Sequence, residues 1–387
     1  MKKNIVIFID GYLPAQKYGG PVTSIVNLVD NLKEKYNFYI ISNEHDLNEK
    51  TRLKGIAKGW NDVRGAKVLY INEKEYTKSN FIDFLKGINI SLIYLSSVFS
   101  YKMNFPAISV AKFMNIPVLL APRGEICEGA MKNKGLKKSV FLRSINILGV
   151  FNEIYFHTTS TDEIEGVKKY FKSPYKRTFL LPNLHGLKIE KKNLHKEPGE
   201  IKVLFISRIQ EKKNLLYAID VISKLSGKKI IFDIYGPIEQ PDYWKKCEDL
   251  IEKVNKSIEI KYKGTLTPQE SKEVYQNYNC FIFPTLSENY GHVIAESLLS
   301  SCPCIISKGT TPWDDVNGNG GFAISLNKKD EFVRALNSIV DMDSYQYQEL
   351  VGKLSEYTNS KLNINELSLK YEEMFETVIS NQEADLS

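Results

Sequence analysis

Two glutamates form the most informative pair of polar residues in the chain. Glu288 comes just before Gly291, and Glu296 lies on a helix that we expect to begin at Gly291. An apolar stripe at helical spacing indicates this helix, and it comprises Ile294, Ala295, Leu298, Leu299 and Cys302. Carboxylates accept hydrogen bonds from sugar hydroxyls, and the free N–H groups of a helix N-terminus bind anions. The arrangement suits a ligand with both sugar and phosphate. The simpler alternative is that Glu288 only caps the helix and that Glu296 is an ordinary surface residue.

Two cations occupy a second segment of interest. Arg208 and Lys213 follow the apolar run Val203–Ser207, so both would project from a loop at the end of a strand. An arginine offers two parallel hydrogen bonds to a phosphate and a lysine offers a point charge. The pair therefore suits a diphosphate, whereas the alternative is a solvated loop, because charged residues are usually exposed.

A glycine pair follows the first apolar run of the chain. Pro21 suits the first position of a helix, which places Gly20 at a helix N-terminus that attracts anions. A turn would explain the same glycines. The loop is too long for the Gly-x-Gly-x-x-Gly fingerprint, which argues against a nicotinamide-dependent dehydrogenase.

The elements that must position these residues come in two series of short apolar runs, separated by longer amphipathic segments. The first series comprises Ile5–Ile9, Phe38–Ser42, Val68–Ile71, Leu92–Leu95, Val118–Ala121 and Ile154–His157. The second comprises Val203–Ser207, Ile230–Tyr235, Ile258–Tyr262, Cys280–Phe283 and Cys304–Ser307. Apolar strands that alternate with helices predict βαβ units and parallel sheets covered on both faces. The fold class is therefore α/β, with two Rossmann-like doubly wound domains whose ligand-binding edges can face one cleft.

The domain boundaries follow from the same pattern. Residues 1–186 form the first predicted domain and residues 187–363 the second. The polar stretch Leu187–Glu200 contains Pro-Gly and is interpreted as the linker. A last amphipathic helix over 364–381 can pack back on the first domain.

Composition limits the remaining function classes. The chain has 387 residues, with 43% hydrophobic and 25% charged, which excludes disordered and coiled-coil proteins. The net charge of +6 permits an anionic ligand or a membrane surface without demanding nucleic acid. Five cysteines without a Cys-x-x-Cys pair indicate reduced, buried thiols. The absence of a signal peptide or an apolar run of membrane-spanning length predicts a cytoplasmic protein.

No metal site is predicted. Asp341-Met342-Asp343 follows a helical stretch, where we interpret it as a polar helix end, and Asp314-Asp315 has the wrong pattern for a metal-binding Asp-x-Asp. The five histidines lack zinc-site spacing.

Further motifs lie in order along the chain. They are Ala121-Pro122-Arg123-Gly124, His157-Thr158-Thr159-Ser160, Leu181-Pro182-Asn183 and Thr311-Pro312-Trp313. With the two glutamates, the Ser-Arg-Ile-x-x-x-Lys-Lys segment and the early Gly-Gly-Pro, they resemble the retaining family 4 glycosyltransferases, which have the GT-B fold. The opening from Tyr12 to Pro21 looks like the subset that builds bacterial surface polysaccharides.

The resemblance implies roles for individual residues. Arg208 and Lys213 match the two cations that bind the donor diphosphate in this family. Glu288 matches the glutamate that contacts the donor sugar, and Glu296 matches the glutamate that binds the ribose of the nucleotide. Arg208, Lys213 and Glu288 are therefore the catalytic candidates. The implied donor-binding positions besides Glu296 are Gly20, Gly264, Leu266, Asn289, Tyr290, Gly291 and His292. Arg123, which stands where many relatives have His-Gly, and His157 are the acceptor-side candidates.

The implied function is a retaining, metal-independent transfer of a hexosyl or related group. The donor would be a nucleotide sugar linked to UDP or GDP, with no cofactor, and the acceptor a glycan or lipid-linked saccharide in bacterial surface polysaccharide biosynthesis. A GT-B sugar-nucleotide epimerase, a phosphorylase and a non-catalytic sugar-nucleotide-binding subunit remain alternatives.

Two basic segments predict peripheral attachment to the inner face of the cell membrane. Met131–Arg143 and Lys168–Arg177 contain no acidic residue, and the second has interleaved aromatic residues. Basic residues near anionic lipid each contribute ~1 kcal/mol, and aromatic rings can lie at the headgroup level. Solvated helix faces would give the same pattern.

Overall fold

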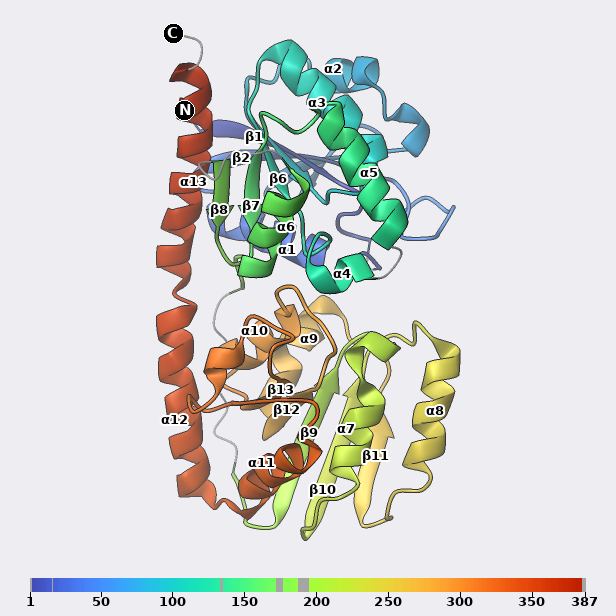
Figure 1. The fold of residues 1–387 in the computed structure, drawn as a ribbon, viewed down its shortest axis with the longest axis vertical. Coiled ribbons are helices and arrows are strands. Elements are labelled where there is room, and N and C mark those ends of the chain that lie inside the picture. The colour runs from blue at the N-terminus through green and yellow to red at the C-terminus, as the bar shows by residue number, and fades with distance from the viewer. Residues whose placement is uncertain (1, 16, 133–134, 172–176, 187–194, 385–387) are drawn as a thin grey trace. The chain divides into compact units, whose positions relative to one another are not determined.

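The computed structural model describes every residue except 1, 16, 133–134, 172–176, 187–194 and 385–387. The chain forms two compact units (Figure 1). The N-terminal unit comprises Met1–Gly186 and Ile364–Ser387, and the C-terminal unit comprises Leu187–Asn363. Most of the predicted linker, residues 187–194, lies outside the described residues. Its last residue, Glu200, begins a strand instead of belonging to a connection.

The N-terminal unit contains an eight-stranded sheet of order β3-β4-β2-β1-β5-β6-β7-β8. All neighbours are parallel except β3 and β4, which are antiparallel. The strands are β1 Lys3–Ile9, β2 Tyr36–Asn43, β3 Trp60–Val63, β4 Ala66–Ile71, β5 Ile90–Ser96, β6 Val118–Ala121, β7 Tyr155–Thr158 and β8 Thr178–Leu180. The strand order reverses between β1 and β5, so ligands are expected at the carboxyl ends of these two strands.

Helices cover both faces of this sheet (Figure 1). The helices are α1 Gly20–Leu32, α2 Lys78–Leu85, α3 Tyr101–Met114, α4 Glu128–Lys132, α5 Gly135–Ile147, α6 Thr161–Tyr170 and α13 Ile364–Ala384. One core contains residues of α1 and α13, and the other contains residues of α2, α3, α5 and α6. The C-terminal helix α13 buries Tyr371, Met374 and Phe375 in the first core, where Phe375 meets Tyr36 edge to face at 5.5 Å. Such aromatic burial supplies much of the packing energy of a core.

The C-terminal unit contains six parallel strands of order β11-β10-β9-β12-β13-β14. They are β9 Glu200–Ile206, β10 Lys229–Tyr235, β11 Ile258–Tyr262, β12 Cys280–Phe283, β13 Cys304–Ser307 and β14 Phe322–Ile324. Numbered from its first strand, the order is 3-2-1-4-5-6, which is that of a Rossmann-type doubly wound sheet. The order reverses between β9 and β12.

The helices of this unit are α7 Leu215–Ile222, α8 Pro241–Ile251, α9 Pro268–Val274, α10 His292–Leu299, α11 Lys329–Asp341 and α12 Ser344–Lys361. Asp341 ends α11, and Asp343 forms a capping box with Gln346 at the start of α12. The interpretation of this Asp-x-Asp sequence as a polar helix end is confirmed. Asp314-Asp315 lies in the short 3-10 turn Asp314–Val316.

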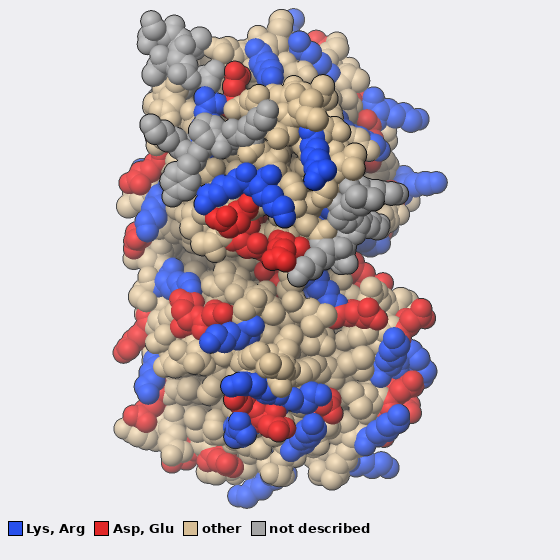
Figure 2. Space-filling view, viewed as in Figure 1, with Lys and Arg blue, Asp and Glu red and all other residues tan. Residues whose placement is uncertain are grey.

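The cysteines, the helix lengths and the surface charges bear on the predictions from composition. All five cysteines are described, all are buried, and no disulfide joins them. Within the described ranges, no helix combines the length and the apolar character that crossing a bilayer requires. Figure 2 shows basic and acidic side chains interspersed over the visible face.

Candidate functional site

Two loops meet at the reversal point of the C-terminal sheet, one after β9 and one after β12. The backbone N–H of Leu286 and the Oγ1 hydroxyl of Thr285 both donate to the carbonyl of Lys212, at 2.9 and 3.1 Å. The Nδ2 amide of Asn214 donates to the carbonyl of Pro284 at 3.0 Å. These bonds hold the two loops together at the edge where ligands of doubly wound sheets bind.

The same loops bring Lys213 and Glu288 into contact. The Lys213 ammonium donates to Oε1 of Glu288, and only 11% and 16% of the two side chains are exposed. Burial, with repulsion from Lys212 and Arg208, lowers the pKa of Lys213. The adjacent Glu288 carboxylate opposes that shift, because an opposite charge in contact favours the protonated amine. Two of the three predicted catalytic residues therefore form one buried pair.

Arg208 lies on the same loop but in a different environment. Its Nη1 donates to Oε1 of Glu239 at 3.0 Å, and the two side chains are 46% and 43% exposed. Glu239 follows β10, so a third loop contributes to this edge. An ion pair this exposed is worth about 0–1 kcal/mol, so Arg208 can readily change partners.

A buried tryptophan holds the loop that runs from Asn289 to His292. Gly291 caps α10 with φ of 73°, a conformation that favours glycine. The indole Nε1 of Trp313 donates to the carbonyl of Tyr290, whose ring packs 5.3 Å from that of Trp313. Tyr290 is 4% exposed and therefore belongs to the packing beneath the loop surface. Sequence reasoning had noted Trp313 only as part of a motif.

Glu296 points from α10 toward α9. Its Oε2 lies 3.4 Å from both the Ser271 hydroxyl and the Tyr275 hydroxyl. Burial raises the pKa of Glu296 to about 7, although nearby Lys272 acts in the opposite direction. A group that changes charge near neutral pH at a ligand-binding edge is a candidate for function.

The turn after β11 contacts the turn after β10 at the same edge. The carbonyl of Gly264 accepts a hydrogen bond from the N–H of Gly236 at 2.8 Å, and Leu266 packs half-buried against the core. A Cβ on Gly236 would lie 1.8 Å from the carbonyl oxygen of Ser207. Gly236 therefore cannot carry a side chain without moving the loop after β9, a constraint that sequence reasoning missed.

The acceptor-side candidates lie at the carboxyl edge of the N-terminal sheet. Arg123 has φ of 56°, and its guanidinium donates to the hydroxyl of Tyr94 at 3.0 Å and to Oδ1 of Asn183. Nδ1 of His157 lies 2.8 Å from the same Tyr94 hydroxyl, and Nε2 lies 3.0 Å from the carbonyl of Leu181. Tyr94 thus connects the two candidates.

Burial gives the two candidates different characters. His157 is fully buried, and burial together with Arg123 lowers its pKa to about 3, so the imidazole is neutral at physiological pH. His157 therefore orients the Tyr94 hydroxyl from inside the core. Arg123, in contrast, is partly exposed. Gly20, the remaining N-terminal candidate, is the first residue of α1 and follows Gly19, which has φ of 65°.

Two half-buried acidic residues near this edge were not among the predicted site residues. Asp10, directly after β1, accepts a hydrogen bond from the Ser100 hydroxyl. Glu125 accepts from the Ser97 hydroxyl and the N–H of Val98, both at 2.7 Å. Burial raises the pKa of both carboxyls. Asp10 gave a sequence signal as the polar residue that ends the first strand.

Residues 188–360 match the family model described as "Glycosyl transferases group 1". The matched residues span nearly the whole C-terminal unit. In sequence, 169 residues are 27% identical to sulfoquinovosyl transferase SQD2 of Arabidopsis thaliana, a match that covers 43% of this chain and 31% of that protein. The matched region thus spans about a third of the length of that relative.

Solved structures share the fold of this chain. The structure of Anabaena HepE with UDP and glucose superposes with a TM-score of 0.71 at 13% identity, covering 96% of this chain and 99% of HepE. Sucrose-phosphate synthase of Thermosynechococcus elongatus gives a TM-score of 0.72 at 14% identity, covering 98% and 100%. The predicted GT-B fold, with two α/β domains, is confirmed.

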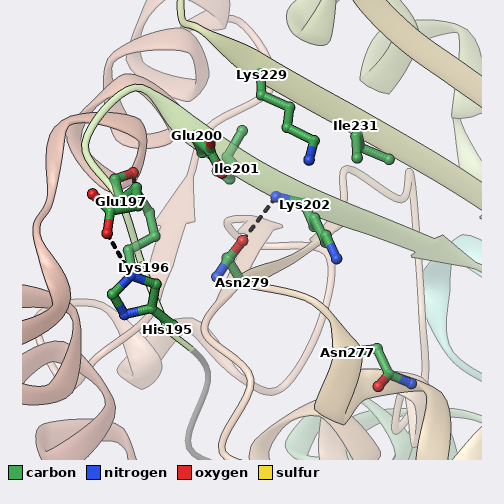
Figure 3. Close-up of a pocket in the computed structure, with 10 residues that line it drawn as sticks. All are labelled: His195, Lys196, Glu197, Glu200, Ile201, Lys202, Lys229, Ile231, Asn277 and Asn279. Atoms are coloured by element: carbon green, nitrogen blue, oxygen red, sulfur yellow. Dashed lines mark hydrogen bonds and ion pairs between the residues drawn. The ribbon is translucent and has the colours of Figure 1, made fainter.

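A small pocket of the C-terminal unit lies at the opposite end of its strands, near their first residues (Figure 3). It is lined at the first residues of β9 and β10, including Lys202 and Lys229, and by Asn279, whose Oδ1 accepts a hydrogen bond from the N–H of Lys202 at 2.8 Å. Because Lys213 and Glu288 follow the carboxyl ends of their strands, this pocket is separate from the predicted site.

Lys196 borders this pocket from within the predicted linker. Its ammonium donates to the carbonyls of Glu197, Val340 and Met342 at 2.8, 2.9 and 3.0 Å. It thereby caps the end of α11, where a cation is favourable. Its role is structural. No group of three potential metal ligands occurs among the described residues.

Proposed function

We propose that the chain is a retaining glycosyltransferase that moves a sugar from a nucleotide sugar to a glycan or lipid-linked acceptor in bacterial surface polysaccharide synthesis. The proposal is carried by the gathering of Arg208, Lys213 and Glu288 at the reversal point of a group 1 glycosyltransferase domain. UDP is the first donor nucleotide to test, because the HepE structure contains UDP and glucose. GDP is the second.

The chemistry follows from the residue types. When the bond between the anomeric carbon and the diphosphate breaks, negative charge develops on the departing phosphate. Lys213, Arg208 and the N-terminus of α10 would stabilise that charge without a metal ion. Glu288 would accept hydrogen bonds from the donor sugar, and Glu296 from the ribose.

Retention of configuration needs a same-face reaction. In our proposal the acceptor oxygen bonds to the anomeric carbon on the face that the diphosphate leaves, and the acceptor proton passes to a diphosphate oxygen. The nucleoside diphosphate is therefore both leaving group and base. The N-terminal unit would contribute the acceptor-side residues, with Arg123 presented by Tyr94 and Asn183.

The acceptor would reach the enzyme at an anionic membrane surface. On α5 and the turn after it, Val140, Ile147 and Leu148 are 55%, 82% and 75% exposed. The sequence from 129 to 152 contains no acidic residue, and Arg143 lies on the exposed stretch. Exposed apolar residues flanked by cations favour the interface of anionic lipid. Within the two predicted basic segments, residues 133–134 and 172–176 and the side chains of 132–137 lie outside the described residues.

The test is a donor panel followed by product analysis. Purified protein is screened by thermal shift against UDP- and GDP-sugars; a ligand at a hundredfold excess over its Kd stabilises by about 2.7 kcal/mol. NMR of the product made from the stabilising donor should show the donor's anomeric configuration. Turnover that requires inorganic phosphate would indicate a phosphorylase instead. Isomerisation of the donor without an acceptor would indicate an epimerase, and donor binding without turnover would indicate a non-catalytic binding subunit.

Membrane attachment is tested separately by liposome flotation. We expect binding to anionic vesicles at low salt, weaker binding at high salt, and loss of binding when Ile147 and Leu148 are changed to Ser. Equally weak binding to neutral and anionic vesicles at low salt would contradict this part of the proposal.

A further inference from the structure

Both cations that the proposed function assigns to the donor diphosphate already have carboxylate partners. Lys213 is paired with Glu288, and Arg208 with Glu239. The four residues come from the loops after β9, β10 and β12, so the pairing is built by three separate segments of the domain. Each of these two cations is therefore neutralised by a carboxylate in the absence of a ligand.

The two pairs differ in burial. The Lys213–Glu288 side chains are 11% and 16% exposed, against 46% and 43% for Arg208–Glu239. A buried ammonium that loses its partner incurs a large desolvation cost, whereas an exposed guanidinium that loses its partner is solvated at once. The inner pair can therefore open only when another anion replaces Glu288 on Lys213.

The backbone around the inner pair is fixed on both sides. The N–H of Glu288 donates to the carbonyl of Thr310 at 2.7 Å, and the N–H of Lys213 donates to the carbonyl of Gln210 at 2.9 Å. The Lys213 ammonium also lies 5.5 Å from the centre of the Phe283 ring. With both backbones anchored, an exchange of partners requires only rotation of the Glu288 side chain, and the ring keeps the ammonium in place.

We propose that Glu288 and Glu239 hold the place of the diphosphate in the empty site, so that donor binding is an exchange of anions. This inference rests on the proposed function. The diphosphate replaces Glu288 on Lys213 and Glu239 on Arg208, and the released Glu288 carboxylate turns to the hydroxyls of the donor sugar. The binding of the sugar and the binding of the diphosphate are thereby coupled through one side chain.

The exchange favours product release. After transfer, the nucleoside diphosphate has no sugar for Glu288 to bind, so Glu288 competes again for Lys213 and displaces the product. A donor satisfies both Lys213 and Glu288, whereas the free diphosphate satisfies only Lys213. Glu288 therefore determines specificity for the donor over the product.

The experiment measures UDP affinity by calorimetry in the wild type and in Glu288→Gln and Glu239→Gln variants, with GDP in parallel. Gln cannot neutralise the cation, so Glu288→Gln should bind UDP about tenfold more tightly, although it turns over more slowly. Glu239→Gln should gain about threefold or less, because its pair is exposed. The matched control is Glu211→Gln on the same turn, which pairs only distantly with Lys246 at 3.9 Å and should bind like the wild type.

A double variant isolates the exchange. In the Lys213→Met background, adding Glu288→Gln should give no gain in UDP affinity, because without the ammonium the Glu288 carboxylate has no cation for which it competes with the diphosphate. Circular dichroism shows whether Glu288→Gln folds; if it does not, Glu288→Asp, with its carboxylate withdrawn by one methylene, gives the same comparison. Equal or weaker UDP binding by the folded variant, with wild-type binding intact, would overturn the exchange alone. A wild type that binds neither UDP, GDP nor any sugar nucleotide would overturn the proposed function.

Discussion

The ligand-binding edges of the two sheets use polar residues in opposite ways. At the C-terminal edge, the cations Arg208 and Lys213 stand on the loop that directly follows β9, and each is paired with a carboxylate. At the N-terminal edge, the carboxylates Asp10 and Glu125 are held by hydroxyl and backbone donors. The first edge is suited to an anionic ligand, and the second to a hydroxyl-rich one.

The largest expected effect tests the cationic edge. Arg208→Ala or Lys213→Ala should reduce transfer by about a hundredfold or more, because each would remove one of the cations that our proposal assigns to the charge developing on the diphosphate. Lys212→Ala is the matched control, since that side chain is exposed and the loop is held through its carbonyl. Kinetics on the best donor in the panel measure the effect. Near-normal kcat/KM in both variants would show that the cations serve another purpose.

A smaller effect tests the N-terminal edge. Arg123→Asn should reduce transfer by about tenfold and leave UDP affinity and donor hydrolysis unchanged, because Arg123 belongs to the N-terminal unit, where it contacts Tyr94 and Asn183, and our proposal assigns it to the acceptor. Asn is chosen because it tolerates the positive φ of this position. Loss of UDP binding in this variant would remove the proposed division between the two edges.

Elements were predictable where they are continuous and apolar. The runs Val118–Ala121, Ile258–Tyr262, Cys280–Phe283 and Cys304–Ser307 coincide with strands residue by residue. The strands β3, β8 and β14 were missed because β3 is polar and partly exposed, and the other two have three residues each. Short or half-exposed strands are determined by their neighbours in the sheet and carry little pattern of their own.

The same division applies to the site. Charged residues directly after apolar strands, such as Arg208 and Lys213, could be assigned to a ligand edge because parallel strands share that edge. Glu239 and Trp313 were missed as site residues, since their importance depends on a partner distant in the sequence. Lys196 shows the opposite error, in which a residue expected to be solvated in a linker is buried. It lies in a polar stretch with a Pro-Gly pair, yet it is 2% exposed and caps a helix. The type of a polar residue does not reveal whether its hydrogen-bond partner is water or a buried carbonyl.

A pH profile sharpens the comparison within the cationic edge. Burial raises the pKa of Glu296 to about 7. In the ribose-binding role that we propose for Glu296, only the carboxylate form would accept hydrogen bonds from both ribose hydroxyls. The ionised fraction rises from about a tenth at pH 6 to about nine-tenths at pH 8, so uridine affinity should increase severalfold over that range. Uridine is used because it has no phosphate to titrate with Lys213. At pH 8 the Glu296→Gln variant should bind uridine more weakly than the wild type, and its uridine affinity should not change with pH. If the affinity of this variant still changed with pH, the titrating group would be a different one.

The smallest expected effect is that of a chelator. Arg208 and Lys213 place two positive charges where a metal-dependent transferase would use a divalent ion, and Asp341-Met342-Asp343, the Asp-x-Asp sequence, is engaged at helix ends. Excess EDTA should therefore change kcat by less than about twofold, whereas Lys213→Ala abolishes most activity under the same conditions. The measurement compares initial rates with EDTA alone and after addition of Mg²⁺ or Mn²⁺. Activity that EDTA removes and either ion restores would mean that the two cations do not carry the leaving-group charge by themselves.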